Sequence, residues 1–343
     1  MANELVKVEA ASIPATAKAT TVPELVERAG GAACFAWDEF FYAEHRNPHT
    51  QKAYQRAVRR FLAWVEDEGV ELPAVTPRMV GDYLGEDLGG SPSKQNLHLA
   101  AIRGFFDRLV QRHVCVLNPA ATVKGVKEEV IEGKTPEITV EQARTLLGSI
   151  RIAKTVKNPE GQEVAIPRVV GLRDRAILAT MAFTGCRAGA VARLRLGDFQ
   201  DDGRQYVLRF REKGGKSREI PVRHDDLEGY ILAYIEAAGI AGDAKDSPLF
   251  RAAINRTAKR LSRRPLTTDR IGDMMKRRLK DAGLPKRLSP HSFRVKTATN
   301  LLEQNVPLED VQHLLGHAEP RTTALYDRRK KQVTRNIVER IPI

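Results

Sequence analysis

The chain has 343 residues, which is enough for two domains of ordinary size. A hydrophobic content of 42% with mixed charges is that of a globular protein, and no apolar run approaches the roughly 20 residues that a membrane span needs. The N-terminus lacks the pattern of a secretory signal. Three scattered cysteines have no metal-ligand spacing and cannot all pair, which fits a reducing, intracellular compartment. They are Cys34, Cys115 and Cys186. From these features together, we expect a soluble, cytoplasmic protein with no membrane attachment.

The net charge of +13 is concentrated in one stretch of the chain. Residues 251–300 carry 15 Lys and Arg against three Asp, a local excess of 12. Apolar residues such as Ile254, Ile271 and Leu279 are interleaved with these cations, so the stretch is expected to fold. The pattern predicts a folded face that binds a polyanion, with nucleic acid as the first candidate. The alternative is a basic face that is merely solvated.

The N-terminal third of the chain predicts a helical domain. Residues 1–35 have no hydrophobic periodicity and predict a flexible arm. A polar capping residue followed by proline then starts a helix at three places: Asn47-Pro48, Thr76-Pro77 and Ser91-Pro92. After the first start, apolar residues recur at helical spacing: Tyr54, Ala57, Val58, Phe61, Leu62 and Val65. Residues 36–122 are therefore predicted to form a small all-helical domain.

A charged stretch with few helix signals, residues 123–137, is interpreted as a linker. The second domain, residues 138–343, begins with a helix in which Thr139 and Gln142 are placed as a capping box.

Strand signals follow in this second domain. Residues 206–210 and 218–222 are two short strand-like runs joined by the glycine-containing turn "REKGGKS". Residues 154–167 are expected to form a surface hairpin. The predicted fold class is mainly α with a small antiparallel β-sheet (α+β).

The segment "HSFRVKTATNLLEQNVPLEDVQHLLGHAEPRTTALYDRR" gathers side chains with acid–base and nucleophilic chemistry. A Ser-Pro helix start precedes His291, so His291 and Arg294 lie on one helical face. A second predicted helix ends at a glycine and leaves His317 at its exit. Tyr326 follows on a short basic segment. A tyrosine hydroxyl has a pKa of about 10 and needs nearby cations and proton acceptors to act as a nucleophile.

Each of these residues alone has an ordinary interpretation. A lone tyrosine or arginine is usually a surface residue, and a histidine after a helix-ending glycine usually interacts with the helix dipole. Two further segments extend the set. The motif "TGCR" places Arg187 at the start of another short helix, and Lys216 lies at the predicted hairpin tip, where its amine could reach an oxygen leaving group.

In this order, "TGCR", "KGGKSREIPV", "HSFR", "LLGH" and "TTALYDRR" resemble the tyrosine recombinases, which include phage integrases and bacterial Xer-type recombinases. The resemblance covers roughly residues 36 to 340, because the first domain also looks like the core-binding domain of this family. It implies a site-specific DNA recombinase or integrase whose catalytic domain follows the linker, with no cofactor and no metal. The implied catalytic pocket consists of Arg187, Lys216, His291, Arg294, His317 and Tyr326.

The resemblance also implies the role of each residue. Tyr326 attacks a DNA phosphodiester and forms a 3′-phosphotyrosine with a free 5′ hydroxyl, while the two arginines stabilise the phosphate oxygens in place of a metal. His291 takes or assists the tyrosine proton and Lys216 protonates the departing 5′ oxygen. His317 hydrogen-bonds a non-bridging oxygen.

Two positions need separate attention. Family members usually carry an acidic residue three positions after the first arginine, where this chain has Ala190. Either activity is reduced or another carboxylate substitutes, with Asp198 and Glu212 as candidates by sequence proximity. Lys213 shares the turn with Lys216, although the spacing to "REIPV" favours Lys216.

The resemblance implies partners as well. The two domains are expected to clamp duplex DNA recombination sites, mostly through phosphates, as a homotetramer on paired sites and with room for accessory proteins. A C-terminal apolar stripe, formed by Val333, Ile337 and Ile341, docks on a neighbouring subunit or packs on its own domain. Two rival functions are a catalytically weak DNA-binding regulator with the same fold, suggested by Ala190, and a type IB topoisomerase-like enzyme that acts on single sites.

Overall fold

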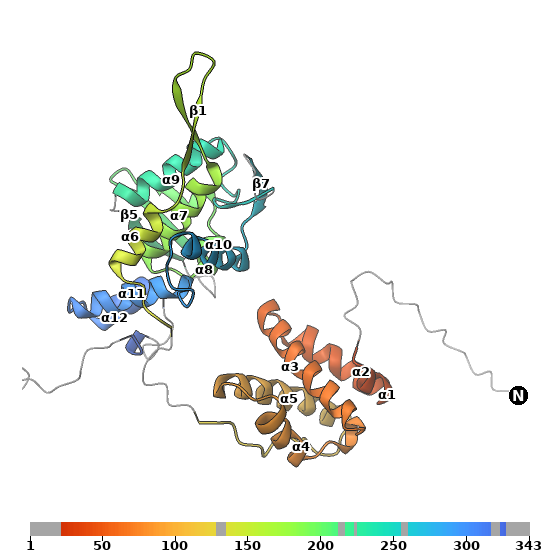
Figure 1. Cartoon of the computed structure of the whole chain (residues 1–343). Helices are drawn as coiled ribbons and strands as arrows, with labels where there is room; N and C mark the ends of the chain where they lie inside the picture. Colours follow the sequence, from red (N-terminus) through yellow and green to blue (C-terminus); the bar gives the residue numbers. More distant parts are fainter. Residues whose placement is uncertain are drawn as a thin grey trace, which may run out of the picture. The chain divides into compact units, whose positions relative to one another are not determined.

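The computed structural model describes residues 22–127, 135–211, 217–222, 225–254, 260–316 and 323–326. The chain divides into two compact units, one ending at residue 129 and the other beginning at residue 130 (Figure 1). Within the described residues, no helix is both long enough and apolar enough to cross a membrane.

In its described residues, the first unit contains helices and no strand. Its elements are α1 (Glu24–Arg28), α2 (Gly31–Asp38), η1 (Glu39–Glu44), α3 (Pro48–Asp67), η2 (Leu72–Ala74), α4 (Pro77–Asp82), η3 (Tyr83–Asp87) and α5 (Pro92–Gln111). The three predicted helix starts are confirmed. The side-chain oxygens of Asn47, Thr76 and Ser91 accept hydrogen bonds from backbone N–H groups two or three residues later, and a proline follows each cap.

Aromatic rings fill the core of this unit. The rings of Trp37 and Phe41 lie 4.4 Å apart between centroids, and Phe105 packs edge-on against Trp37 at 5.6 Å. Phe40 is accommodated by Gly104, since a Cβ atom at residue 104 would lie 2.8 Å from its ring. Each buried aromatic side chain removes a large apolar area from water, so these rings supply much of the core.

The helical unit starts earlier than the expected boundary at residue 36. Helices α1 and α2 occupy part of the stretch that the sequence predicted as a flexible arm, and Leu25 and Val26 are fully buried. A helix of five residues is too short to display hydrophobic periodicity, which explains why the pattern was missed. Residues 1–21 of that arm lie outside the described residues.

The second unit combines helices with small antiparallel sheets, which confirms the predicted fold class. Its elements are α6 (Val140–Gly148), β1 (Ala153–Lys157), β2 (Glu163–Pro167), α7 (Val169–Thr184), α8 (Ala188–Ala192), η4 (Leu196–Asp198), β3 (Phe199–Asp201), β4 (Tyr206–Arg211), β5 (Ser217–Val222), α9 (Asp225–Ala238), β6 (Arg251–Ala253), β7 (Leu261–Pro265), α10 (Thr268–Asp281), α11 (Pro290–Glu303) and α12 (Leu308–Leu315). Thr139 and Gln142 form the predicted capping box at the start of α6.

The predicted strands and the predicted hairpin are confirmed. Strands β4 and β5 pair with Leu208 opposite Ile220, next to β3 in one sheet. Strands β1 and β2 form the hairpin, which projects beyond the rest of the unit (Figure 1). Within the described residues, β6 and β7 make the remaining antiparallel pair.

Helix α7 lies at the centre of the second unit and contacts α9 and α11. The carboxylate of Asp174 on α7 is fully buried and accepts hydrogen bonds from three guanidinium groups. They belong to Arg173 at 2.7 Å, Arg277 at 3.2 Å and Arg278 at 2.7 Å. The last two lie on α10, so this network ties α10 to the start of α7.

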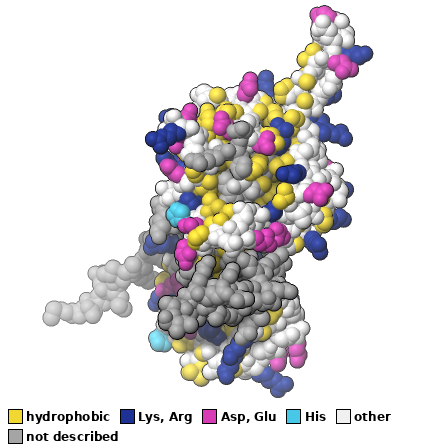
Figure 2. Space-filling view, turned by 90° about the vertical axis from the view of Figure 1, so that its left-hand side faces the viewer, with side chains coloured by type: hydrophobic (Ala, Val, Ile, Leu, Met, Phe, Trp, Pro, Cys, Tyr) yellow, Lys and Arg dark blue, Asp and Glu magenta, His cyan; other side chains and the backbone are white. Residues whose placement is uncertain are grey.

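The described part of the basic stretch, residues 251–254 and 260–300, is folded, as its apolar pattern predicted. Helix α10 buries one apolar stripe, formed by Ile271, Met274, Met275 and Leu279, and exposes much of its basic side. Several of the cations do not face solvent: besides Arg278 in the Asp174 network, Arg251 pairs with Asp243 at 2.5 Å, and Arg294 is 1% exposed. On the face in Figure 2, Lys and Arg side chains recur along the edge below the projecting hairpin, with a few acidic side chains among them.

Candidate active site

Tyr326 and His291 meet although 35 residues separate them. The Tyr326 hydroxyl lies 2.8 Å from Nε2 of His291, and the tyrosine side chain is buried, with 7% of its surface exposed. The tyrosine packs in a small apolar cluster with residues of α11 and α12: Val295, Ala298, Leu302, Val311 and Leu315. The Thr299 hydroxyl also donates to the backbone oxygen of Tyr326 at 3.5 Å.

The first turn of α11 presents His291 and Arg294 together. Ser289 and Ser292 form a capping box, with the backbone N–H of Ser289 donating to the Ser292 hydroxyl at 3.1 Å. Arg294 donates from Nη1 to the backbone oxygen of Gly185 at 3.0 Å and also hydrogen-bonds Tyr326. The predicted shared face is therefore present, and the tyrosine hydroxyl contacts both residues on it.

Arg187 reaches the same region from the exit of α7. Helix α7 ends at Gly185, whose φ of +61° lies in the left-handed region that glycine adopts without strain. Two residues later, Arg187 caps α8 and donates from Nη1 to the backbone oxygen of Gly316 at 3.2 Å. A Cβ atom at residue 185 would lie 2.6 Å from Leu315, so the end of α12 rests directly on this loop.

The concentration of positive charge shifts the pKa values of the site. Burial lowers the pKa of Arg294 to about 10, and the charges of Arg187 and Arg218 act in the same direction, while Tyr326 opposes the shift. Burial also lowers the pKa of His291 below 6.5, with further contributions from Arg294 and Arg187. At neutral pH the arginine therefore stays charged and the histidine neutral. A neutral imidazole can accept the tyrosine proton.

Arg218 is a member of this region that the sequence reasoning missed. Its side chain is 8% exposed, and it donates to the backbone oxygens of Leu314 and of His313, the latter at 3.2 Å. It thus binds the negative end of the α12 dipole. A signal was present: β5 alternates exposed and buried positions, and Arg218 occupies an inward position together with Ile220 and Val222.

Among the described residues, the carboxylate of Asp198 forms an ion pair with Arg211 and none with Arg187. The two oxygens of Asp198 accept from Arg211 at 3.1 Å and from the backbone N–H of Arg195 at 2.8 Å. Ala190 itself is 9% exposed within α8. Glu212 lies outside the described residues.

Three other candidates also lie outside the described residues: Lys213, Lys216 and His317. Strand β5 begins one residue after Lys216, and the α12 cap, Gly316, immediately precedes His317.

Beside the site, a cavity of about 540 Å³ is lined by Arg187 and His291 and by α10 residues that include Lys276. Among the described residues, no group of three or more His, Cys, Asp or Glu side chains could hold a metal ion.

Two family comparisons match the two units separately. Residues 157–332 match the Phage integrase family, and residues 37–113 match the Phage integrase, N-terminal SAM-like domain. Tyrosine recombinase XerC of Pelobacter propionicus is 32% identical over 286 residues, which cover 82% of this chain and 84% of that protein. Tyrosine recombinase XerD of Bifidobacterium longum is 29% identical over 285 residues, 81% of this chain and 85% of that protein.

Solved structures share the fold. The XerH site-specific recombinase bound to its difH substrate has a TM-score of 0.59 at 21% identity, covering 82% of this chain and 76% of that chain. A lambda integrase dimer bound to a COC′ core site has a TM-score of 0.60 at 17% identity, covering 90% of this chain and 79% of that chain.

Fold and sequence together define a site-specific recombinase of the tyrosine class. The chain belongs to the phage integrase family. The alternative, a catalytically weak DNA-binding regulator with the same fold, is not favoured by these matches.

Proposed function

We propose that this recombinase cleaves and rejoins duplex DNA with Tyr326 as its nucleophile and His291 as the acceptor of the tyrosine proton. The observation that carries the proposal is the 2.8 Å hydrogen bond between the Tyr326 hydroxyl and Nε2 of His291, beside the buried guanidinium of Arg294. A nucleophile, a neutral base and a fixed cation in contact are the combination that activates a weak oxygen nucleophile.

The reaction is a phosphoryl transfer that conserves the bond energy. The Tyr326 oxygen forms a bond to phosphorus as the bond from phosphorus to the 5′ oxygen breaks, and the tyrosine proton passes to His291. The products are a 3′-phosphotyrosine and a strand with a free 5′ hydroxyl. Attack by the 5′ hydroxyl of a partner strand reverses the step and needs no ATP.

Arg187 and Arg294 stabilise the charge that spreads over the phosphate oxygens. A guanidinium carries five N–H donors, so the contacts with Gly316 and Gly185 leave donors that can turn to a phosphate. The carbonyl end of α12 carries a partial negative charge and faces both Arg187 and Arg218, so it offsets part of the repulsion among the cations of the site.

Lys216 and His317 complete the proposed site by resemblance. Lys216 protonates the departing 5′ oxygen, and His317 hydrogen-bonds a non-bridging oxygen of the phosphate. Their chain neighbours support both assignments, because Arg218 connects the strand after Lys216 to the helix end before His317.

The partners of the reaction are proposed to be duplex DNA sites and further copies of this chain. The solved relatives include recombinases bound to DNA and a lambda integrase tetramer bound to a Holliday junction. The first unit is proposed as the core-binding domain. Its helix α3 carries exposed or half-exposed cations, such as Arg56, Arg59 and Arg60. A cytoplasmic location and a C-terminal stripe that docks between subunits belong to the same proposal.

The assignment of the proton donor can be tested through the leaving group. A 5′-bridging sulfur leaves as a thiolate and needs no proton. We expect Lys216→Ala to lose cleavage of an ordinary nicked suicide duplex and to recover it on the sulfur substrate, while the matched control Lys213→Ala cleaves both. If Lys213→Ala instead loses cleavage of the ordinary duplex and recovers it on the sulfur substrate, Lys213 is the proton donor. Recovery by neither variant would refute protonation from this turn.

A further inference from the structure

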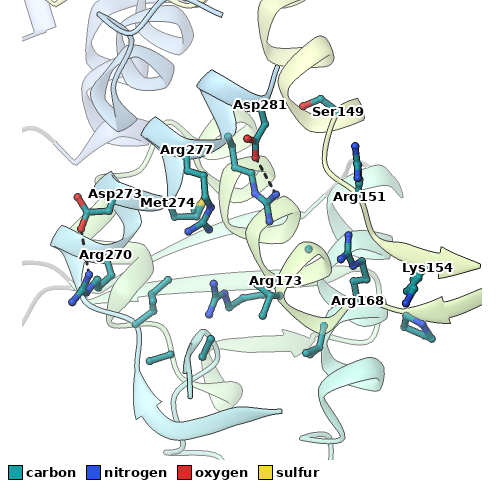
Figure 3. A pocket seen from close by; sticks show the side chains of 18 of the residues that line it. Ser149, Arg151, Lys154, Arg168, Arg173, Arg270, Asp273, Met274, Arg277 and Asp281 are labelled. Carbon is teal, nitrogen blue, oxygen red and sulfur yellow. Dashed lines mark ion pairs between the residues drawn. The ribbon is translucent and has the colours of Figure 1, made fainter. Parts of the chain in front are cut away.

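A large basic cavity lies in the second unit and is not lined by Arg187, His291, Arg294 or Tyr326. Its volume is about 1250 Å³, and it is bordered by the base of the β1–β2 hairpin, the start of α7, β6 and one side of α10 (Figure 3). Arg187 follows the other end of α7, and Arg294 hydrogen-bonds Gly185 there. A helix of 16 residues is about 24 Å long, so the side of the cavity at the start of α7 lies about that far from Gly185, whereas Asp273 on α10 lines both this cavity and the one beside the active site.

Cations dominate the lining of this cavity. They are Arg151, Lys154, Arg168, Arg173, Arg270, Arg277 and Arg278, against the carboxylates of Asp273 and Asp281. Two of the lining ion pairs are loose, with Arg270 to Asp273 and Arg278 to Asp281 each at 3.6 Å (Figure 3).

Three of these cations are exposed and independent of α10. Arg151, Lys154 and Arg168 come from the turn after α6, from β1 and from the position before α7. Figure 3 draws them together at one side of the cavity. No ion pair between described residues involves any of the three. We refer to Arg151, Lys154 and Arg168 as the hairpin-base cations.

Rigid backbone holds the hairpin-base cations in place. The backbone N–H of Arg168 donates to the Ile152 oxygen at 2.7 Å. A Cβ atom at Gly171 would overlap the Arg151 carbonyl oxygen, so glycine is what lets this turn lie against the first turn of α7. Behind them, the buried carboxylate of Asp174 joins α7 to α10. The cations therefore have a fixed support.

The start of α7 adds positive potential to the cavity. Val169, Val170 and Gly171 of its first turn line the space, the helix has no side-chain cap, and no acidic residue lies in its first turn. The unpaired N–H groups and the dipole of a long helix favour an anion here.

We propose that this cavity binds the sugar–phosphate backbone of duplex DNA at a distance from the phosphodiester that is cleaved. The cations are spread around a wide opening on several elements and do not converge on one point. Such spacing suits the repeated charges of a nucleic acid strand better than one small anion. The proposal rests on the proposed function for its choice of DNA, and it adds a second contact surface on the catalytic unit.

The test compares the salt dependence of DNA binding. The variant Arg151→Gln/Lys154→Gln/Arg168→Gln is compared with a control that neutralises three exposed cations elsewhere in the unit, Arg144→Gln/Arg204→Gln/Lys245→Gln. The slope of log K against log salt is negative, and each lost phosphate contact makes it shallower by about 0.9. The slope of the cavity variant should therefore be shallower than that of wild type by about 2.7. The control should leave the slope unchanged, and Arg151→Lys/Arg168→Lys should preserve it.

Duplexes with arms of increasing length give a second readout. Wild type should gain affinity as the arm reaches the cavity, and the cavity variant should gain less, while both form the covalent adduct equally at saturating DNA. Equal slopes and equal length dependence for cavity variant and control would overturn the proposal. The slopes can be measured on any duplex, whether or not an adduct forms. Failure of wild type to form any adduct would therefore refute the proposed function and not the proposed contact surface.

Discussion

Replacing Gly185 by alanine tests whether the end of α12 supports the active site. Gly185 terminates α7 with φ +61°, and its carbonyl oxygen accepts from Arg294 at 3.0 Å. A methyl group there would lie 2.6 Å from Leu315 and 3.1 Å from Thr297. The substitution should therefore push α12 away and disturb the anchor of Arg294.

The size of the effect follows from two contributions. A left-handed alanine costs about 1–2 kcal/mol, and a methyl forced into a packed contact costs about 1–3 kcal/mol more. Lower entropy of the unfolded chain returns about 0.4–1 kcal/mol. The free energy of unfolding should thus fall by about 2–4 kcal/mol. The matched control is Gly239→Ala, which has φ +62° after α9 but no atom within 4 Å, and it should cost only about 1 kcal/mol.

Urea unfolding followed by far-UV circular dichroism measures the loss. Both tryptophans, Trp37 and Trp64, lie in the first unit, so their fluorescence reports on a region that neither substitution touches. Adduct formation on a suicide duplex should fall for Gly185→Ala and persist for Gly239→Ala. Equal destabilisation by the two substitutions, with equal adduct yields, would refute the role assigned to the α12 contact.

Three further perturbations have defined outcomes. Because the pKa of His291 lies below 6.5, a pH–rate profile of adduct formation should stay level as the pH falls through 6.5 and decline only below it. The unfolded chain binds more protons at this position in that range, so the free energy of unfolding contributed by His291 should fall as the pH drops from 6.5 toward the folded pKa. Asp174→Asn should lower the free energy of unfolding by about 3–5 kcal/mol in urea titrations, because three guanidiniums lose a buried carboxylate. Arg218→Leu should cost about 1.5–3 kcal/mol and slow adduct formation, with Arg218→Lys partly restoring the rate.

Each of these outcomes can fail visibly. A rate that declines above pH 6.5 would remove His291 as the proton acceptor. Unchanged stability of Asp174→Asn would mean that α7 and α10 are held together by packing alone. Normal adduct formation by Arg218→Leu would show that the α12 end keeps its position without this guanidinium.

Local signals predicted the features whose cause is local. The helix starts at Asn47, Thr76, Ser91 and Ser289 were predicted because a cap is a contact between residues two or three apart. The strand pair β4–β5 was predicted because glycines in the turn and alternating apolar residues favour a hairpin.

Features that depend on distant packing were missed or came only from resemblance. The burial of Leu25 and Val26 requires the rest of the first unit, and the ionic centre at Asp174 requires α10, which begins 94 residues later at Thr268. Spacing placed His291 and Arg294 on one face, but the approach of Tyr326 to them was inferred from the family pattern. No local rule connects residues 35 positions apart.

Covalent trapping tests the central claim most directly. Wild type and Tyr326→Phe are incubated with a nicked suicide duplex taken from the native recombination site, and any adduct is digested and its modified peptide is identified by mass spectrometry. The proposed mechanism predicts a 3′-phosphodiester on Tyr326 in wild type and no adduct in the variant, with equal DNA binding by both. An adduct on another residue, or tight binding of that duplex by wild type without any adduct, would contradict it.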